Sequence, residues 1–297
     1  MDSTLLYINI GINPNIVNLG GLLITWHGVF TAVGILAGVW LAVRLATGRG
    51  FNEDDAYSVG LVVVGAGIVG ARALYVIENY GDPGSGLHSV GDIFRINEGG
   101  ISIYGAIIGG AVAGWAFGLW KKMPCAIGAD GGGFGMLLGL AIGRIGDIIN
   151  GEHFAKVSDL PWAVTYSHVN SPSFARAPQH PAVVYEMIGD LVIIGMLAVL
   201  WRRQSKSGVI FAGAFLLYSI MRFFVSYLRV DSEKPALGLS TPQVVSLIVM
   251  PVAALLLLFF LRRTEPELTP VQPSRPAIPR AELRRRQRSR PPAKSRN

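Results

Sequence analysis

Residues 242–261 read PQVVSLIVMPVAALLLLFFL, a run of 20 residues without a charged side chain. A helix rises about 1.5 Å per residue, so this run can cross the roughly 30 Å of hydrocarbon in a bilayer. Arg262 and Arg263 follow it directly. A basic segment after an apolar run is typical of a cytoplasmic membrane boundary. The stretch therefore predicts a protein whose solvent is a membrane.

The rest of the chain repeats this pattern. With 51% hydrophobic and 15% charged residues, its composition lies outside the range of soluble domains. Six other apolar runs are long enough to span a bilayer: residues 22–45, 56–77, 101–119, 127–149, 183–201 and 209–228. The sequence predicts an all-α integral membrane protein with seven transmembrane helices.

The basic residues predict how these spans are oriented. When the spans are threaded alternately, the connections on one side and the C-terminal tail hold 18 of the 26 Lys and Arg residues, and the opposite loops hold five. Because cytoplasmic loops carry the excess of Lys and Arg, we expect the N-terminus outside and the C-terminus inside.

The chain divides into two parts at its C-terminal end. We expect residues 1–263 to form the transmembrane catalytic domain and residues 264–297, rich in Pro and Arg, to form a disordered cytoplasmic tail. That tail explains the net charge of +7, so we expect no nucleic-acid partner. The single cysteine, Cys125, excludes an intramolecular disulfide and a cysteine-rich metal cluster.

Glycines recur about four residues apart in two of the spans. They include Gly105 and Gly109 in the third span and Gly135 and Gly139 in the fourth. In membrane helices this spacing lets two backbones approach closely. We therefore expect the third and fourth spans to pack against each other.

Arginines inside membrane spans call for an explanation, because a charge there needs a partner or a wet cavity. Three spans contain one: Arg72, Arg144 and Arg222. Arg144 precedes Asp147 by three residues, which places both on one side of a helix. The segment GRIGDIINGEH at residues 143–153 thus gathers a cation, two carboxylates, an amide and an imidazole. It predicts either a functional site or a salt bridge that only locks the bundle.

A second polar group follows one face of the sixth span. Tyr218, Arg222, Ser226 and Arg229 lie at helical spacing and form one stripe. Guanidinium groups can grip a phosphate through paired hydrogen bonds, so the stripe suits an anionic head group. Arg229 alone could instead be an interface residue, and Arg72 could be a third phosphate ligand or the partner of Glu78.

Together these residues indicate a site for a phosphodiester-bearing lipid. The sequence contains no His-Glu-x-x-His motif, no phosphate-binding loop and no evident Ser–His–Asp set. If a reaction occurs, the nucleophile must therefore arrive with a substrate.

At these residues the chain resembles the prolipoprotein diacylglyceryl transferase family. The matching segments follow one another in order: ITWHG at 24–28, GARALYV at 70–76, GGISIYGAIIGG at 99–110, GRIGDIINGE at 143–152, PWAVTY at 161–166, HPAVVYE at 180–186 and YSIMRFFVSYLR at 218–229. The resemblance implies a multi-pass enzyme of the bacterial plasma membrane. Such an enzyme moves the diacylglyceryl group of phosphatidylglycerol to the lipobox cysteine of a prolipoprotein signal peptide and needs no cofactor or metal.

The resemblance also implies roles for individual residues. Arg144 would bind the lipid phosphate, and Arg222 with Tyr218 would stabilise it as it leaves. The expected catalytic residues are Arg144, Arg222, Tyr104 and Tyr218. The expected substrate-binding residues are Arg144, His27, Arg72, Asp147, Asn150, Gly151, Glu152, Ser226 and Arg229. Glu186, in HPAVVYE, matches a family segment without a clear role.

Three positions depart from the family pattern, and a fourth, Tyr104, lies where the family varies. His27 stands where Tyr is usual, Tyr104 where members have either His or Tyr, Asp147 where Asn is usual, and Ser226 where the family has Glu. The base that takes the thiol proton stays open among Tyr104, His27 and Asp147. Two alternatives to the enzyme also stay open: a homologue that binds lipid without transferring it, and an anion or lipid transporter.

Overall fold

The computed structural model describes residues 7–20, 22–80, 89–94, 100, 102–203, 206–232 and 238–264. Within these residues, seven helices are long and apolar enough to cross a membrane, which confirms the prediction of seven spans. They are α1 Trp26–Gly48, α2 Glu53–Asn79, α3 Ile103–Trp120, α4 Cys125–Asn150, α5 Ala182–Arg203, α6 Val209–Val225 and α7 Thr241–Arg262. Residues 265–297 of the expected tail lie outside the described part, so the domain division stays a prediction.

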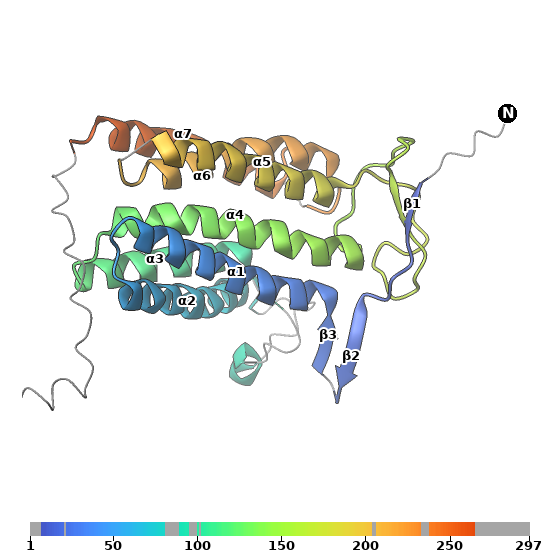
Figure 1. The fold of residues 1–297 in the computed structure, drawn as a ribbon. Coiled ribbons are helices and arrows are strands. Elements are labelled where there is room, and N and C mark those ends of the chain that lie inside the picture. The colour runs from blue at the N-terminus through green and yellow to red at the C-terminus, as the bar shows by residue number, and fades with distance from the viewer. Residues whose placement is uncertain are drawn as a thin grey trace, which may run out of the picture. The chain divides into compact units, whose positions relative to one another are not determined.

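Short strands gather at one end of the bundle (Figure 1). β1 Ile8–Ile10 pairs in parallel with β4 Val164–Tyr166, and β2 Asn15–Leu19 pairs antiparallel with β3 Leu22–Thr25. Residues 22–25, expected to open the first span, therefore belong to a strand. The helix begins at Trp26 instead, because the Thr25 hydroxyl accepts a hydrogen bond from the backbone N of Gly28 at 3.2 Å and caps it.

α4 is the central helix. α1 packs along one side of it, α5 and α6 pack on the other side, α2 packs against α3 and α7 packs against α6 (Figure 1). Buried apolar side chains fill the space between α4, α5 and α6: Phe134, Leu137, Ile193, Leu197 and Ile210. Outward-facing leucines such as Leu61, 77% exposed, cover the bundle, as expected where lipid replaces water as the solvent.

The expected pairing of the third and fourth spans is wrong. The glycines of α4 face α1: a Cβ on Gly38 would lie 2.5 Å from the carbonyl oxygen of Gly135. The glycines of α3 face α2, where Gly105 meets the backbone of Gly70. Helical spacing shows which face of a helix is small, and it does not show which neighbour uses that face.

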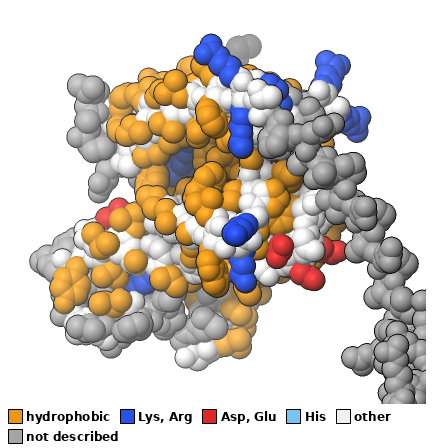
Figure 2. All heavy atoms as spheres, turned by 90° about the vertical axis from the view of Figure 1, so that its left-hand side faces the viewer, with side chains coloured by type: hydrophobic (Ala, Val, Ile, Leu, Met, Phe, Trp, Pro, Cys, Tyr) orange, Lys and Arg blue, Asp and Glu red, His pale blue; other side chains and the backbone are white. Residues whose placement is uncertain are grey.

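Basic side chains lie at the end of the bundle opposite the strands, which Figure 2 shows face on. Exposed ones at the helix ends there are Arg44, Lys121, Lys122, Arg202, Arg203 and Arg262. This agrees with alternate threading of the spans. Which end faces the cytoplasm stays a prediction.

One buried carboxylate at this end joins α4 to α6. Asp130 of α4 is fully buried and accepts hydrogen bonds from the backbone N of Gly208 at 2.8 Å and of Phe211 at 2.9 Å. These groups belong to the first turn of α6, where helix N–H groups otherwise have no partner. Arg49 lies 3.9 Å from the same carboxylate. Asp130 therefore caps α6 from a neighbouring helix.

We expect Asp130→Asn to lower the free energy of unfolding by about 1–3 kcal/mol, because the amide nitrogen would face a backbone donor that the carboxylate now satisfies. Thermal unfolding in detergent measures this change. Asp54→Asn is the matched control, since Asp54 is an exposed acid in the first turn of α2. Equal unfolding temperatures for the two variants would contradict the capping role.

Candidate active site

Three guanidinium groups surround one buried carboxylate, that of Glu186 in the second turn of α5. Arg144 of α4 approaches it to 2.5 Å between Nη2 and Oε2. Arg222 of α6 forms an ion pair with Oε1, and Arg229 reaches the same oxygen at 3.4 Å. Glu186 is only 1% exposed. The structure thus brings together Arg144, Arg222 and Arg229 from separate segments of the chain.

The guanidinium groups are not bare cations. Glu186 faces all three, Asp147 accepts a hydrogen bond from Arg144 at 2.7 Å, and Asp231 accepts one from Arg229 at 2.7 Å. Buried charges need such partners, because an unpaired ion in an apolar interior is strongly destabilising. An incoming anion would therefore have to share or displace a carboxylate that already occupies the site.

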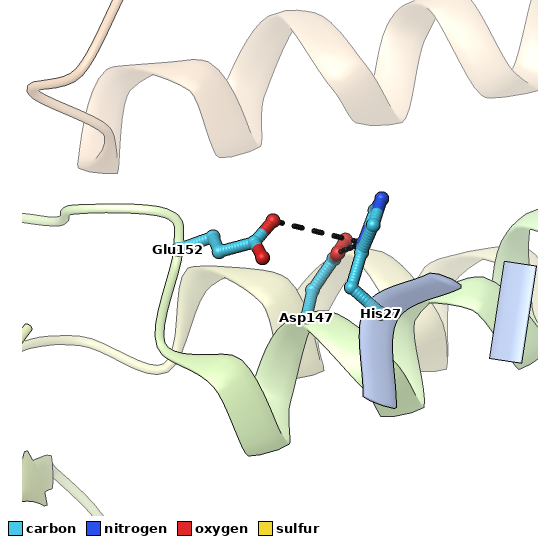
Figure 3. A group of neighbouring side chains, drawn as sticks. All are labelled: His27, Asp147 and Glu152. Carbon is cyan, nitrogen blue, oxygen red and sulfur yellow. Dashed lines mark hydrogen bonds and ion pairs between the residues drawn. The ribbon is translucent and has the colours of Figure 1, made fainter. Parts of the chain in front are cut away.

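Asp147 links this arginine cluster to an imidazole. Its side chain is 4% exposed, and its Oδ1 lies 2.5 Å from Nδ1 of His27, the second residue of α1. The other carboxylate oxygen, Oδ2, accepts from Arg144 and lies 3.4 Å from Nε2 of His153. Both oxygens of Asp147 are thus engaged. Figure 3 shows the side of the site on which Asp147 meets His27.

The end of α4 folds a second carboxylate toward the same imidazole. Gly151 terminates the helix in a left-handed conformation with φ 72°, and a Cβ there would lie 2.6 Å from Oγ of Ser171. This turn positions Glu152, whose Oε2 lies 3.7 Å from Nδ1 of His27. The Asn150 amide donates to the other Glu152 oxygen at 2.7 Å. Gly151 contributes through its backbone, because a larger residue would be strained.

His27, Asp147 and Glu152 also have the spacing of a small cation site, with ligand atoms within 4.8 Å of one another. Two observations oppose a metal there. The Asp147 oxygens already accept from His27 and Arg144, and the Arg144 guanidinium, 2.7 Å from Asp147, would repel a second cation. The group is better suited to holding a proton than a metal ion.

Two tyrosines lie beside the arginine cluster. Tyr218, one helical turn before Arg222, interacts electrostatically with Arg144 and with Tyr104 of α3. Tyr104 in turn interacts with Arg222 and Arg229. Phenol groups next to guanidinium groups can donate hydrogen bonds to an anion held between them.

Two residues expected to bind substrate have partners elsewhere. Arg72 donates to the backbone carbonyl oxygens of Asp92 at 2.6 Å, Gly100 at 2.7 Å and Ile93 at 2.8 Å, so it ties α2 to the segments that precede α3. The Ser226 hydroxyl donates to the backbone oxygen of Arg222 at 2.6 Å. Neither contact involves the carboxylates of the cluster.

The structure adds residues to which the sequence assigned no role. Glu186 sits at the centre of the site, and Asp190, one turn later on α5, is 1% exposed with an Oδ1 that has no hydrogen-bond partner among the described residues. Both are ionisable groups inside a span, which is the signal that singled out the arginines. Applying the same criterion to acids would have found them.

The outer rim of the site lies in the loop after α6. Burial alone would raise the pKa of Asp231, but hydrogen bonds with His153 and Arg229 outweigh it and hold that pKa well below its ordinary value. In β4, burial raises the pKa of Tyr166 to about 12, and its hydroxyl donates to the backbone oxygen of Ile148 at 2.9 Å. Asp231 is therefore ionised and Tyr166 protonated at neutral pH.

We expect Asp231→Asn to lower the unfolding temperature at pH 7 and this difference to narrow in acid. A carboxyl whose pKa is depressed in the folded state stabilises the fold fully above its ordinary pKa of about 4, and that contribution is lost progressively as the pH falls toward the lower pKa of the folded state. Unfolding temperatures of both proteins between pH 7 and pH 2 measure this narrowing, which should begin below about pH 4. A constant difference across this range would contradict it, and Asp159→Asn, at an exposed loop acid, is the control.

The chain is similar to known proteins over most of its length. Residues 14–259 match the family described as prolipoprotein diacylglyceryl transferase. A phosphatidylglycerol–prolipoprotein diacylglyceryl transferase of Acaryochloris marina is 36% identical over 261 residues, covering 86% of this chain and 93% of the relative. The protein of the same name from Clostridioides difficile is 34% identical over 231 residues, covering 77% of this chain and 88% of the relative.

Proposed function

Because this chain belongs to the prolipoprotein diacylglyceryl transferase family, we propose that it moves the diacylglyceryl group of phosphatidylglycerol to the lipobox cysteine of a prolipoprotein. It is a multi-pass membrane protein. The proposed location is the bacterial plasma membrane, with the site near the outer leaflet and no nucleic-acid partner. The names of the relatives do not favour a transporter or a lipid-binding protein without activity.

The proposed reaction is a displacement at carbon. The cysteine sulfur forms a C–S bond with the carbon of the diacylglyceryl group that carries the phosphate. The C–O bond between this carbon and the phosphate breaks. Its electron pair stays on the phosphate oxygen, so glycerol phosphate leaves with one more negative charge than the phosphodiester had. The thiol proton passes to a base. Nothing else has to be supplied.

The observation that carries this proposal is the convergence of Arg144, Arg222 and Arg229 around one position. Negative charge grows on the phosphate as the C–O bond breaks, so guanidinium groups fixed there stabilise the transition state more than the bound lipid. Tyr104 and Tyr218 lie close enough to interact with these arginines and can donate hydrogen bonds to the same anion.

The remaining proposed contacts lie around this centre. Asp147 and Glu186 hold the guanidinium groups in place, and His27, Asn150, Gly151 and Glu152 form the wall beside Asp147. Arg72 and Ser226 are proposed to act at a distance. Arg72 holds the backbone at Asp92, Ile93 and Gly100, and Ser226 forms a hydrogen bond to the turn of α6 that carries Arg222.

The test uses the full chain in vesicles of acyl-labelled phosphatidylglycerol, with a synthetic lipobox peptide. We expect label to move to the peptide and glycerol phosphate to be released in equal amounts. A peptide with Ser in place of Cys and vesicles of phosphatidylcholine are the controls. A folded protein that binds phosphatidylglycerol and labels no peptide would refute the enzyme proposal.

A further inference from the structure

The imidazole of His27 is held by one nitrogen only. Its Nδ1 lies 2.5 Å from Oδ1 of Asp147, and no described residue forms a hydrogen bond with its Nε2. Figure 3 shows the second ring nitrogen pointing away from both Asp147 and Glu152. The side chain of His27 is 43% exposed, whereas that of Asp147 is 4% exposed. A buried carboxylate thus orients an accessible imidazole.

This pairing selects the tautomer of the His27 imidazole. A carboxylate beside Nδ1 keeps the proton of the neutral imidazole on that atom, so the lone pair lies on Nε2. The same logic operates where a carboxylate orients a histidine that takes a proton from a nucleophile. His27 is therefore set up to accept a proton at its exposed nitrogen.

The other two candidates for the base fit less well. Asp147 has both oxygens engaged by His27, Arg144 and His153, and it is nearly buried. Tyr104 has a phenol, and an ordinary phenol pKa of about 10 means that it carries its proton at neutral pH. It can donate to the leaving phosphate, but it cannot take a proton from the thiol without first losing its own.

The position of His27 also fits. Asp147 bridges His27 and Arg144, so the imidazole and a phosphate-binding guanidinium lie on the two oxygens of one carboxylate. After His27 takes the proton, the imidazolium faces Asp147 and also Glu152, at 3.7 Å. Arg144 opposes this positive charge, and the two carboxylates offset it.

We propose that Nε2 of His27 takes the proton from the lipobox thiol as sulfur attacks the glycerol carbon. This inference rests on the proposed function and names the base for it. The S–H bond breaks, the new N–H bond forms on His27, and sulfur uses its electron pair for the C–S bond. The imidazolium then releases the proton to solvent or to the departing glycerol phosphate, and the enzyme is restored.

The first test is the pH dependence of transfer in His27→Gln. A general base contributes about 10²–10⁴-fold, so we expect a loss of that size at pH 6.5. Without the base, the rate follows the fraction of thiolate, which rises tenfold per pH unit up to a thiol pKa of about 8.5. The difference from the wild-type protein should therefore shrink by nearly 10²-fold between pH 6.5 and pH 9. A loss that is the same at every pH, or no loss, would overturn the proposal.

The second test replaces the lipobox cysteine by selenocysteine. A selenol is already ionised at neutral pH, so it needs no base, and His27→Gln should transfer lipid to this peptide at nearly the wild-type rate. If the variant is equally slow with both peptides, His27 does not act on the thiol. His168→Gln is the control, since His168 lies in the loop after β4 and its Nδ1 accepts from the backbone N of Asn170.

The outcomes separate this inference from the proposed function. If the wild-type protein transfers lipid to neither peptide, the function itself fails. If the wild-type protein is active and His27→Gln keeps a normal rate and pH profile, only the assignment of the base fails. The apparent KM for phosphatidylglycerol should be unchanged in His27→Gln, because the lipid phosphate is held by the arginines. A large rise in that KM would place His27 in lipid binding instead.

Discussion

Arg144→Ala is expected to lower the rate of diacylglyceryl transfer by about 10³-fold or more while the protein still inserts into the membrane. Removing one fixed donor from a site where negative charge develops lowers rates by about 10²–10³-fold, and removing an arginine from phosphoryl chemistry lowers them by up to about 10⁵-fold. Arg144 also contacts both Glu186 and Asp147, so its loss removes a cation that two buried carboxylates share.

The measurement is transfer of labelled lipid to the lipobox peptide, normalised to folded protein. Arg144→Lys separates charge from geometry: lysine keeps the charge but cannot hold Glu186 and Asp147 together with one planar group, so we expect a smaller but clear loss. Arg202→Ala, at an exposed arginine in the last turn of α5, is the control for removing a positive charge. A rate for Arg144→Ala near that of the wild-type protein would exclude Arg144 from the mechanism.

Glu186→Gln is expected to have the largest effect on stability. The substitution leaves Arg144, Arg222 and Arg229 around a neutral amide, and removing one partner from a buried ion pair destabilises a protein by about 3–5 kcal/mol. The unfolding temperature in detergent should fall by several degrees. Glu152→Gln is the control, because its carboxylate is 34% exposed and contacts His27 and Asn150 rather than three guanidinium groups, so we expect a much smaller fall.

An added anion should partly reverse this loss. If Glu186 occupies the place beside which the lipid phosphate binds, glycerol phosphate can take over its role between the guanidinium groups. By mass action, a ligand that binds only the folded protein raises its stability. Glycerol phosphate should therefore raise the unfolding temperature of Glu186→Gln more than that of the wild-type protein. An equal response in both proteins would show that Glu186 is not the counter-ion of this site.

The proximity of several residues of the proposed site follows from the sequence, because its strongest signals are local. Arg144, Asp147, Asn150, Gly151 and Glu152 lie within one turn and a half of helix and its cap, so their proximity follows from helical spacing alone. The stripe on the sixth span holds for Tyr218 and Arg222, which lie one turn apart on α6. Arg229 lies beyond a short 3₁₀ turn, Ser226–Leu228, and still reaches the cluster.

The sequence missed what depends on contact between distant segments. His27 and Asp147 lie 120 positions apart, and Arg229 and Glu186 lie 43 apart. No spacing rule relates such residues. The predicted packing of the third span against the fourth was wrong for the same reason. The close glycine contacts of α4 are with α1, although α3 is its neighbour in the chain. Likewise, the contacts of Arg72 with the backbone carbonyl oxygens of Asp92, Ile93 and Gly100 join segments that its place in α2 does not relate.

By itself, the amino-acid sequence determined that the helices lie in a membrane, how many spans there are and that some spans contain charged residues. Each of these is a sum over neighbouring residues, because hydrophobicity and helical length accumulate along the chain. Only the tertiary structure decided which helix each glycine face meets, which carboxylate holds each arginine and which imidazole is left with an accessible nitrogen. Those depend on how the helices pack in three dimensions, since a buried charge is stabilised by whichever partner the packing brings within about 4 Å.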